Sequence, residues 1–179
     1  DPELLQNRGF GPAPEYRTIW AIQRPAHLAQ DDTPMVEVVK HVLAEIPGPP
    51  DQVIVLLQPT QPLRRPEHIV KAIALLEESG ADSVVSVVQL PLTYSPEYVC
   101  EVVGDRAGPW LDGCSAGFDW SDVPTRRQDV RPAYLRDGTV YAFLRKTVRN
   151  YGHIYGMYAK ALIIPPEETC ALDTPEDWA

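Results

Sequence analysis

The sequence predicts an α/β fold built on a mostly parallel sheet, and two observations carry that prediction. Two short apolar runs, VIVLL at 53–57 and SVVSVV at 83–88, have the continuous hydrophobicity of strands that are buried on both faces. Between them, a segment that begins at Pro66 and stops at Gly80 has apolar residues at helical spacing. A strand, a helix and a second strand this close in sequence are typical of a right-handed unit with parallel strands.

Composition places the chain among ordinary globular domains. It has 179 residues, of which 44% are apolar and 23% are charged, so we expect a single domain over 1–179 with one sizeable core. The formal net charge of −9 argues against a nucleic-acid binder, which would present a basic face. An anionic substrate would therefore have to be held by a local cluster of arginines.

The cysteine pattern predicts a reducing compartment. Cys100, Cys114 and Cys170 are widely spaced and form no C-x-x-C pair, so neither a disulfide framework nor a zinc ribbon is expected. No apolar run approaches the ~20 residues that a membrane-spanning helix needs, and no signal peptide opens the printed sequence. We therefore expect a cytoplasmic protein.

The first fifty residues predict one strand and one helix. YRTIWAI at 16–22 is a plausible short strand. Thr33 and Pro34 match an N-cap followed by proline at the first helical position, and apolar residues recur at helical spacing over 34–46. The GPP segment at 48–50 is expected to end this helix.

The second half of the chain predicts an excursion from the sheet followed by two more strands. Residues 89–127 form either an arm or a lid, with a strand expected at 98–103. After a turn at Asp137–Gly138, TVYAFL at 139–144 is the next expected strand, and ALII at 161–164 is the last.

A polar loop follows the first buried strand, in the region where ligands collect in open α/β sheets. Two prolines stiffen this loop, and Gln58, Thr60 and Gln61 supply neutral donors and acceptors. Arg64 and Arg65 precede the start of the next helix, which itself attracts anions. The loop is a candidate site for a sugar or a phosphate; the alternative interpretation is a polar loop with surface arginines.

A second candidate is a local cluster of arginines in this acidic chain. Arg126, Arg127, Arg131 and Arg136 lie within eleven residues, with Gln128 among them. The planar guanidinium group fits carboxylates and phosphates, so the cluster suits an acidic ligand. The alternative interpretation is a solvated charged loop.

A third candidate is Asp173, which follows the last expected strand. A carboxylate beside an anion site is a suitable ligand for Mg²⁺. Glu176 and Asp177 come next, in a segment that looks like the start of a final helix, where acidic residues are also simply stabilising. The sequence contains no P-loop, no dinucleotide fingerprint, no nucleophile elbow and no histidine pair at metal-ligand spacing.

Two motifs are specific, and three further segments accompany them in order. The specific ones are LLQPTQPLR at 56–64 and RRQDVRPAYLRDGTVYAF at 126–143. The accompanying segments are RPAHLAQDDTPMVEVVKHVL at 24–43, ADSVVSV at 81–87 and LDTPEDW at 172–178. Together they resemble the acylneuraminate cytidylyltransferases, also called cytidine monophosphate–sialic acid synthetases, over most of the chain.

The resemblance implies a Rossmann-like nucleotidyltransferase fold with an inserted arm at 89–125. It implies transfer of a cytidylyl group from CTP to a nonulosonic, sialic-type acid, with Mg²⁺ as cofactor and pyrophosphate as leaving group. It also implies a homodimer in which the arm brings residues to the partner's site. The residues carried over by motif are Gln58, Thr60, Arg64, Arg127 and Gln128 for substrate, Arg127 and Asp173 for catalysis, and Asp173 for the metal.

Three departures from the family pattern leave other hypotheses open. The family's glycine- and arginine-rich nucleotide loop has no counterpart in the printed sequence, so we expect the sequence to be N-terminally incomplete or inactive alone. Ala171 stands where the first metal-binding aspartate is expected, and Gln61 replaces a serine. One alternative is a non-catalytic relative that binds a sugar acid or sugar nucleotide. Another is a nucleotidyltransferase for a sugar 1-phosphate, against which the RRQD motif argues.

Overall fold

The computed structural model describes residues 21–110, 120–121, 123–174 and 177. Most of the strand expected at 16–22 lies outside these residues, as do Cys114 and Glu176, and the two described residues of that strand have no regular structure. The chain divides into two compact units with the boundary between Pro49 and Pro50, and each is described by itself. The expectation of one domain with a dimerisation arm stays a prediction.

The first unit contains the helix that the sequence predicts. Helix α1 (Met35–Glu45) has Pro34 as its N-cap and buries Val39, and a short 3₁₀ turn, η2 (Ala26–Leu28), precedes it. The helix stops because Ile46 adopts an extended backbone, and the prolines after it cannot donate helical hydrogen bonds.

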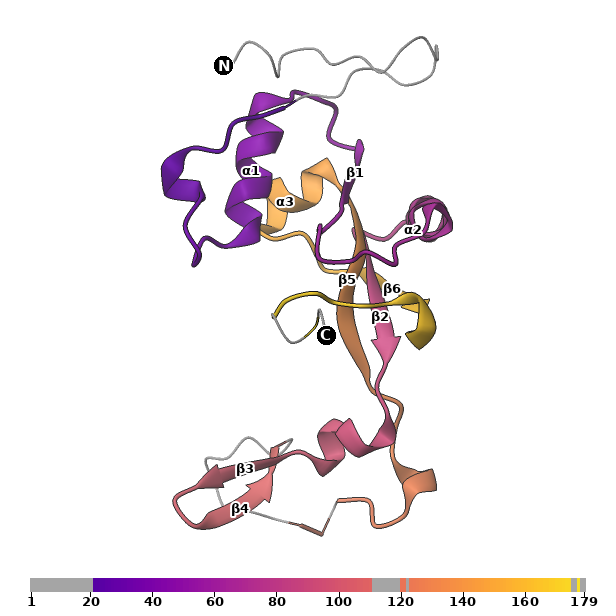
Figure 1. Ribbon diagram of the computed structural model, residues 1–179. Helices are drawn as coiled ribbons and strands as arrows, with labels where there is room; N and C mark the ends of the chain where they lie inside the picture. The colour runs from indigo at the N-terminus through magenta and orange to yellow at the C-terminus, as the bar shows by residue number, and fades with distance from the viewer. Residues whose placement is uncertain (1–20, 111–119, 122, 175–176, 178–179) are drawn as a thin grey trace. The chain divides into compact units, whose positions relative to one another are not determined.

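A four-stranded mixed sheet forms the centre of the second unit (Figure 1). Its strands are β1 (Val53–Leu56), β2 (Ser83–Gln89), β5 (Tyr134–Leu144) and β6 (Ala159–Ile164), in the order β1-β5-β2-β6. The α/β class is confirmed, but the prediction of a mostly parallel sheet is wrong. Strand β5 pairs antiparallel with both β1 and β2, and among the described strands only β2 and β6 pair in parallel.

The position of β5 explains this error. β1 and β2 run in the same direction, since each is antiparallel to β5, so the chain does return in the same sense after the helix between them. The later strand β5 then occupies the place between the two. Its apolar run marks a buried strand, but hydrophobicity does not encode the direction in which a buried strand runs.

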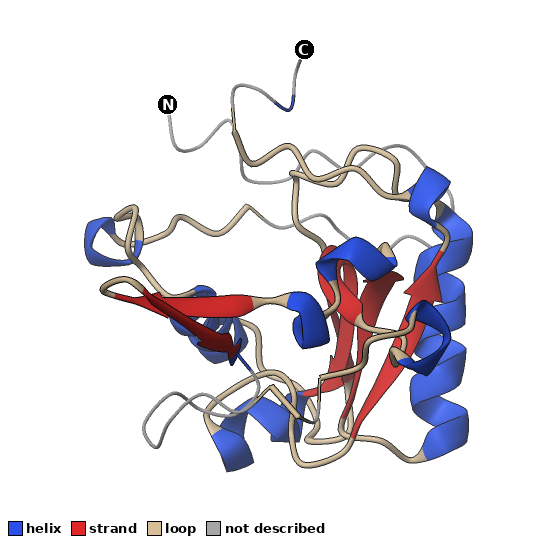
Figure 2. Ribbon diagram, turned by 90° about the horizontal axis from the view of Figure 1, so that it is seen from below, coloured by secondary structure: helices blue, strands red, loops and turns tan. Residues whose placement is uncertain are grey.

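Helix α2 (Pro66–Ser79) connects β1 to β2 and packs on β2, β5 and β6 (Figure 2). Its buried face includes Ala72 and Leu76, which join Ala81, Val84, Val140 and Ala142 in the core. Both ends agree with the sequence prediction. Pro66 is the first helical residue, and Gly80 closes the helix in the left-handed conformation at φ 65°.

Strand β5 is longer than predicted and contains an irregularity. The expected turn at Asp137–Gly138 is instead a break in the register between β2 and β5, where one residue on β2 faces several on β5. Val85 pairs with Tyr141 while Val87 pairs with Arg136, so the intervening residues of β5 bulge out of the ladder. Asp137–Gly138, predicted as a turn, therefore form part of a bulge rather than a hairpin turn.

The excursion between β2 and β5 carries a small sheet of its own. Strands β3 (Cys100–Val103) and β4 (Arg106–Pro109) pair antiparallel, and Gly104 turns between them at φ 67° (Figure 1). The predicted strand at 98–103 corresponds to β3. The excursion also contains the 3₁₀ turns η3 (Leu92–Tyr94), η4 (Pro96–Tyr98) and η6 (Arg127–Asp129).

Besides β4 and the 3₁₀ turns of the excursion, a helix and a further 3₁₀ turn of the second unit were not predicted. Helix α3 (Arg145–Tyr151) follows β5 directly and ends at Gly152, and the 3₁₀ turn η7 (Pro166–Glu168) follows β6. The Gly152 stop signal could have revealed α3, but the helix has two turns and too few apolar positions for a clear period. None of the helices in the described residues is long and apolar enough to cross a membrane.

Candidate functional site

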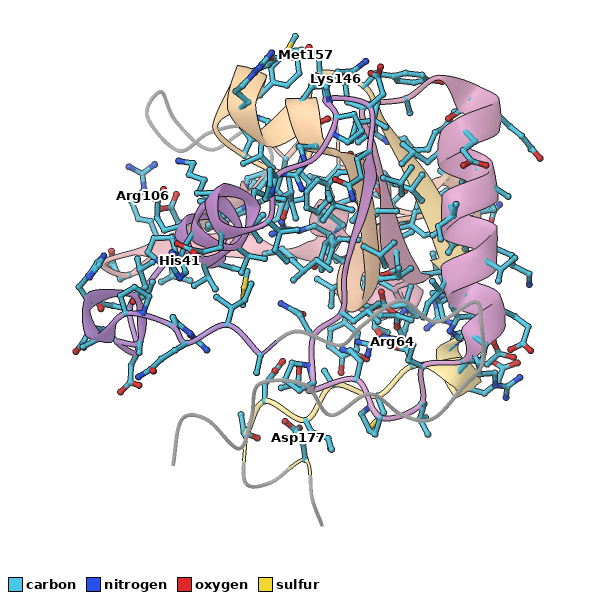
Figure 3. The ribbon with its side chains drawn as sticks, turned by 90° about the horizontal axis from the view of Figure 1, so that it is seen from above. His41, Arg64, Arg106, Lys146, Met157 and Asp177 are labelled. Atoms are coloured by element: carbon cyan, nitrogen blue, oxygen red, sulfur yellow. The ribbon has the colours of Figure 1, made fainter. Side chains whose placement is uncertain are left out.

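Arg64 fixes the polar loop that follows β1. Its Nη2 donates to the backbone carbonyl of Gln58, and its Nε donates to the carbonyl of Thr139 in β5 at 2.5 Å. Figure 3 shows Arg64 at the end of the sheet. Its partial burial lowers the pKa of the guanidinium, and the carboxylate of Asp137 opposes that shift. Arg64 thus joins the two ends of its own loop and ties the loop to the sheet.

Gln61 makes a second connection between the same loop and β5. Its side chain is buried, and its Nε2 donates to the backbone carbonyl of Asp137. A serine at this position is too short to span that gap, so the replacement noted in the sequence has a structural consequence. The glutamine closes one side of the loop against the bulge.

The bulge in β5 is held by its own side chains. The buried carboxylate of Asp137 accepts hydrogen bonds from the Thr139 backbone N–H at 3.2 Å and from Thr139 Oγ1 at 2.5 Å. Gly138 lies between them at φ 76°, and a β-carbon there would stand 2.3 Å from Gln58 Oε1. Only a glycine lets the Gln58 side chain approach the strand this closely.

A third segment, residues 169–173, completes the surroundings of the loop. The Leu172 N–H donates to the Thr60 carbonyl at 3.0 Å. Just before this segment, Glu168 accepts from Arg65 Nη1 at 2.8 Å and lies 2.8 Å from His68 Nε2. The chain after β6 is thereby attached both to the loop and to the start of α2.

The three segments, together with Val88 of β2, line an open cavity of about 340 Å³. This volume is at the small end of the range for small-molecule sites. The cavity is lined by Gln58, Gln61, Val88, Leu135, Arg136, Asp137, Gly138, Tyr141, Thr169, Cys170, Ala171 and Asp173. Amide, guanidinium, carboxylate and phenol groups therefore converge on a space suited to a polar molecule of sugar size.

Comparison with known proteins gives consistent relatives, although no family model matches the chain. The N-acylneuraminate cytidylyltransferase of Streptococcus agalactiae serotype V is 25% identical over 169 residues, which are 90% of this chain and 37% of that protein. The CMP-N,N'-diacetyllegionaminic acid synthase of Legionella pneumophila is 30% identical over 130 residues, which are 70% of this chain and 50% of that protein. The chain is a distant homologue of the N-acylneuraminate cytidylyltransferases. It spans half or less of the length of these two relatives.

A solved structure supports the fold of this cytidylyltransferase homologue. A CMP:2-keto-3-deoxy-manno-octonic acid synthetase in complex with CTP superposes with a TM-score of 0.51 at 17% identity. The superposition covers 82% of this chain and 65% of the other. The nucleotidyltransferase fold that the motifs implied is therefore present, with a mixed sheet in place of a mostly parallel one.

The structure brings some of the residues predicted from the cytidylyltransferase motifs together and leaves others apart. Gln58 and Asp173 line the cavity, whereas Thr60 and Arg64 do not line it and instead make hydrogen bonds that hold the loop. Arg127 and Gln128 lie in η6 and do not line the cavity of their own chain. Their role at a sugar site stays a prediction.

Sequence reasoning did not assign Tyr141 or Asp137 to the site, and it grouped Arg136 with the arginine cluster rather than with the QPTQPLR loop. Tyr141 belongs to the apolar run of β5, which was predicted only as a strand, yet it lines the cavity. Burial raises the pKa of its phenol, and the nearby Tyr155 raises it further. The bulge could not be foreseen because it depends on contacts with Gln61 and Gly138, and only folding makes those contacts.

The carboxylates near the cavity bear on the Mg²⁺ site that the sequence predicts. No group of three or more His, Cys, Asp or Glu side chains within the described ranges could hold a metal ion. Asp137 is engaged with Thr139, and Asp177 caps the N–H groups of Asp173 and Thr174 at 2.9 and 2.7 Å. The exposed Asp173 lines the cavity and is the carboxylate that would hold a metal there. Mg²⁺ is commonly held by one or two carboxylates together with substrate phosphates.

Proposed function

We propose that this chain forms the acid-sugar site of an enzyme that transfers a cytidylyl group from CTP to a nonulosonic acid and releases pyrophosphate. The observation that carries the proposal is the cavity at the QPTQPLR loop, bounded by the β5 bulge and by residues 169–173. The distant cytidylyltransferase relatives supply the reaction class. The cysteine pattern supports a cytoplasmic location for this enzyme.

Gln58 and Asp173 of the cavity, and the residues that hold the loop, each have a task in that reaction. In-line attack by the sugar's anomeric hydroxyl on the α-phosphorus requires accurate positioning and neutralisation of charge, and little covalent help from the protein. Gln58 would hydrogen-bond the sugar, and the Arg64 and Gln61 contacts keep its loop in place. Asp173 would hold Mg²⁺, which, when bound, neutralises the charge of the departing pyrophosphate.

A homodimer is part of the proposal because of the surface of the excursion. Its described residues leave several large apolar side chains open to solvent: Tyr94 at 66%, Val102 at 67%, Trp110 at 56% and Trp120 at 49% exposed. An exposed apolar set of this kind is typical of a protein interface. A second copy of the chain would cover it, and Arg127 and Gln128 of one copy would then serve the cavity of the other.

A non-catalytic binding protein remains the second candidate. The specific observation in its favour is Ala171, which lines the cavity and offers no carboxylate where the metal pair is expected. Such a protein would bind the sugar acid or its cytidylylated form and would not turn it over.

Pyrophosphate release is the experiment that separates the two candidates. The protein expressed from its whole gene is incubated with CTP, Mg²⁺ and, in turn, sialic, legionaminic, pseudaminic and 3-deoxy-octulosonic acids. We expect sugar-dependent release with at least one acid and a large loss in Gln58→Ala. An exposed glutamine of the first unit supplies the matched control, Gln30→Ala, which should retain activity.

Calorimetry on the same panel completes the test. Binding of an acid without pyrophosphate release would favour the non-catalytic candidate. The absence of both binding and release with all four acids would contradict the proposed substrate class.

A further inference from the structure

The charged side chains of the cavity are few. Among the described residues that line it, Arg136 is the one cation, and Asp137 and Asp173 are the two carboxylates. Asp137 is buried and already accepts two hydrogen bonds from Thr139. The cavity therefore offers an incoming anion one guanidinium group.

Aromatic contacts hold Arg136 in place. Its guanidinium lies over the ring of Tyr155, 5.3 Å from the centroid, and its Nη1 donates to the Tyr155 hydroxyl. Tyr155 also meets the cavity residue Tyr141 edge to face, with 6.5 Å between ring centroids. The backbone carbonyl of Tyr155 accepts from the buried Ser83 hydroxyl of β2 at 2.6 Å. This chain of contacts links the orientation of Arg136 to the sheet.

Arg136 differs from four arginines near the loop and the excursion. Arg65, Arg126 and Arg131 each form an ion pair with a carboxylate, and Arg64 donates its hydrogen bonds to backbone carbonyls. Within the described part of the chain, no carboxylate pairs with Arg136, and its guanidinium instead contacts the phenol of Tyr155. A tyrosine orients a guanidinium and leaves its charge uncompensated, so the remaining N–H groups can bind a carboxylate in the planar geometry that this pair prefers.

The charge balance indicates which anion fits. A triphosphate carries several negative charges and needs several cations, whereas a monocarboxylate needs one. With Asp173 also facing the cavity, a single arginine suits the smaller charge. The apolar lining by Val88, Leu135 and Tyr141 would cover the carbon skeleton of the same molecule.

We propose that Arg136, oriented by Tyr155, binds the carboxylate of the acidic sugar and so determines the preference of this cavity for a sugar acid over a neutral sugar. The inference rests on the proposed function and adds a residue to it. It places carboxylate recognition within the same chain as Gln58, independently of any arginine from a partner.

The test compares each acid with its uncharged analogue. The probes are the panel acid with the highest kcat/KM and the methyl ester of that acid, and both are measured by competition in the pyrophosphate assay. Arg136→Gln should raise the KM for the acid by about tenfold to a hundredfold, because it removes a charged hydrogen-bond donor. The KM for CTP should stay within about twofold, since the nucleotide does not use this group.

Three further variants separate recognition from structure. The wild type should prefer the acid to its ester, and Arg136→Gln should bind both equally. Arg136→Lys should recover part of the preference, since it restores the positive charge but not the planar pair of N–H donors that binds both carboxylate oxygens. Tyr155→Phe should weaken the preference while kcat is retained. The exposed helix residue Arg149 supplies the matched control, and Arg149→Gln should leave all constants unchanged.

The outcomes are distinguishable. If the wild type neither binds nor converts any panel acid, the proposed function fails and this inference fails with it. If the wild type converts an acid and Arg136→Gln still prefers that acid to its ester, the inference alone is overturned.

Discussion

Gly138 shows how one residue controls the approach of two chain segments. Its positive φ and the lack of room for a β-carbon, which would stand 2.3 Å from Gln58 Oε1, are separate demands, one conformational and one steric. Gly104 makes the first demand alone, because its φ is 67° and a β-carbon there would meet nothing within 4 Å. Substitutions at the two glycines therefore distinguish the cost of a positive φ from the cost of a steric clash with Gln58.

Alanine substitution at these positions should have unequal effects. Gly104→Ala should cost about 1–2 kcal/mol of unfolding free energy for its left-handed backbone. Gly138→Ala should cost more and should raise the KM for the sugar, because the new methyl group displaces the Gln58 amide. Thermal unfolding and sugar KM are measured on both variants. Equal KM values in Gly138→Ala and wild type would show that Gln58 does not depend on this approach.

At the scale of elements, side-chain ion pairs and hydrogen bonds connect η7 to the start of α2. Glu168 of η7 contacts His68 and the side chain of Arg65 at the start of α2, and Lys71 lies near enough to act on it. The hydrogen bond from His68 chiefly lowers the pKa of Glu168, and Arg65 adds to that effect. Because Glu168 directly precedes residues 169–173, these contacts fix the position at which that segment begins to line the cavity.

The lowered pKa predicts how stability responds to acid. A carboxyl group with a depressed pKa in the folded state contributes its stabilisation above its unfolded pKa, and that contribution is lost as the pH falls through the folded value. Glu168→Gln should therefore be less stable than wild type near neutral pH, and the gap should close as the pH falls below about 4. Urea unfolding between about pH 6 and pH 3 measures the gap. Glu167→Gln is the control, and an unchanged gap in acid would contradict the assigned ionisation.

The same elements show what the sequence could and could not predict. Helix α2 was predicted at both ends because Pro66 and Gly80 are local signals. The QPTQPLR loop was recognised because it follows a buried strand and matches a motif. The walls at 136–141 and 169–173 come from chain that returns after a long separation, and no local pattern records that return. The place of β5 between β1 and β2 escaped prediction for the same reason.

At the scale of the whole molecule, the separation of Arg127 from the cavity of its own chain predicts complementation. In a homodimer that exchanges these arms, Arg127→Ala and Gln58→Ala would each disable every site. A mixed dimer would regain one intact site, composed of Gln58 from one copy and Arg127 from the other. An equal mixture of the two variants, refolded together, should therefore recover about a quarter of the wild-type activity.

Pyrophosphate release from the mixture, compared with each variant alone, measures this recovery. The control is the Arg127→Ala variant alone, carried through the same refolding procedure. The absence of recovery in a mixture that sedimentation shows to be dimeric would place Arg127 outside the partner's site.

The base of the excursion has a practical consequence. Gln89 and Tyr134 face each other in the β2–β5 ladder, and the Leu90 N–H donates to the Ala133 carbonyl at 2.9 Å just beyond them. The chain thus leaves and re-enters the sheet at adjacent points, as in a hairpin with a very long loop. Replacing residues 91–132 by a two-residue turn would keep the ladder continuous. A shortened chain of this kind would be a minimal scaffold on which the cavity can be studied without the excursion.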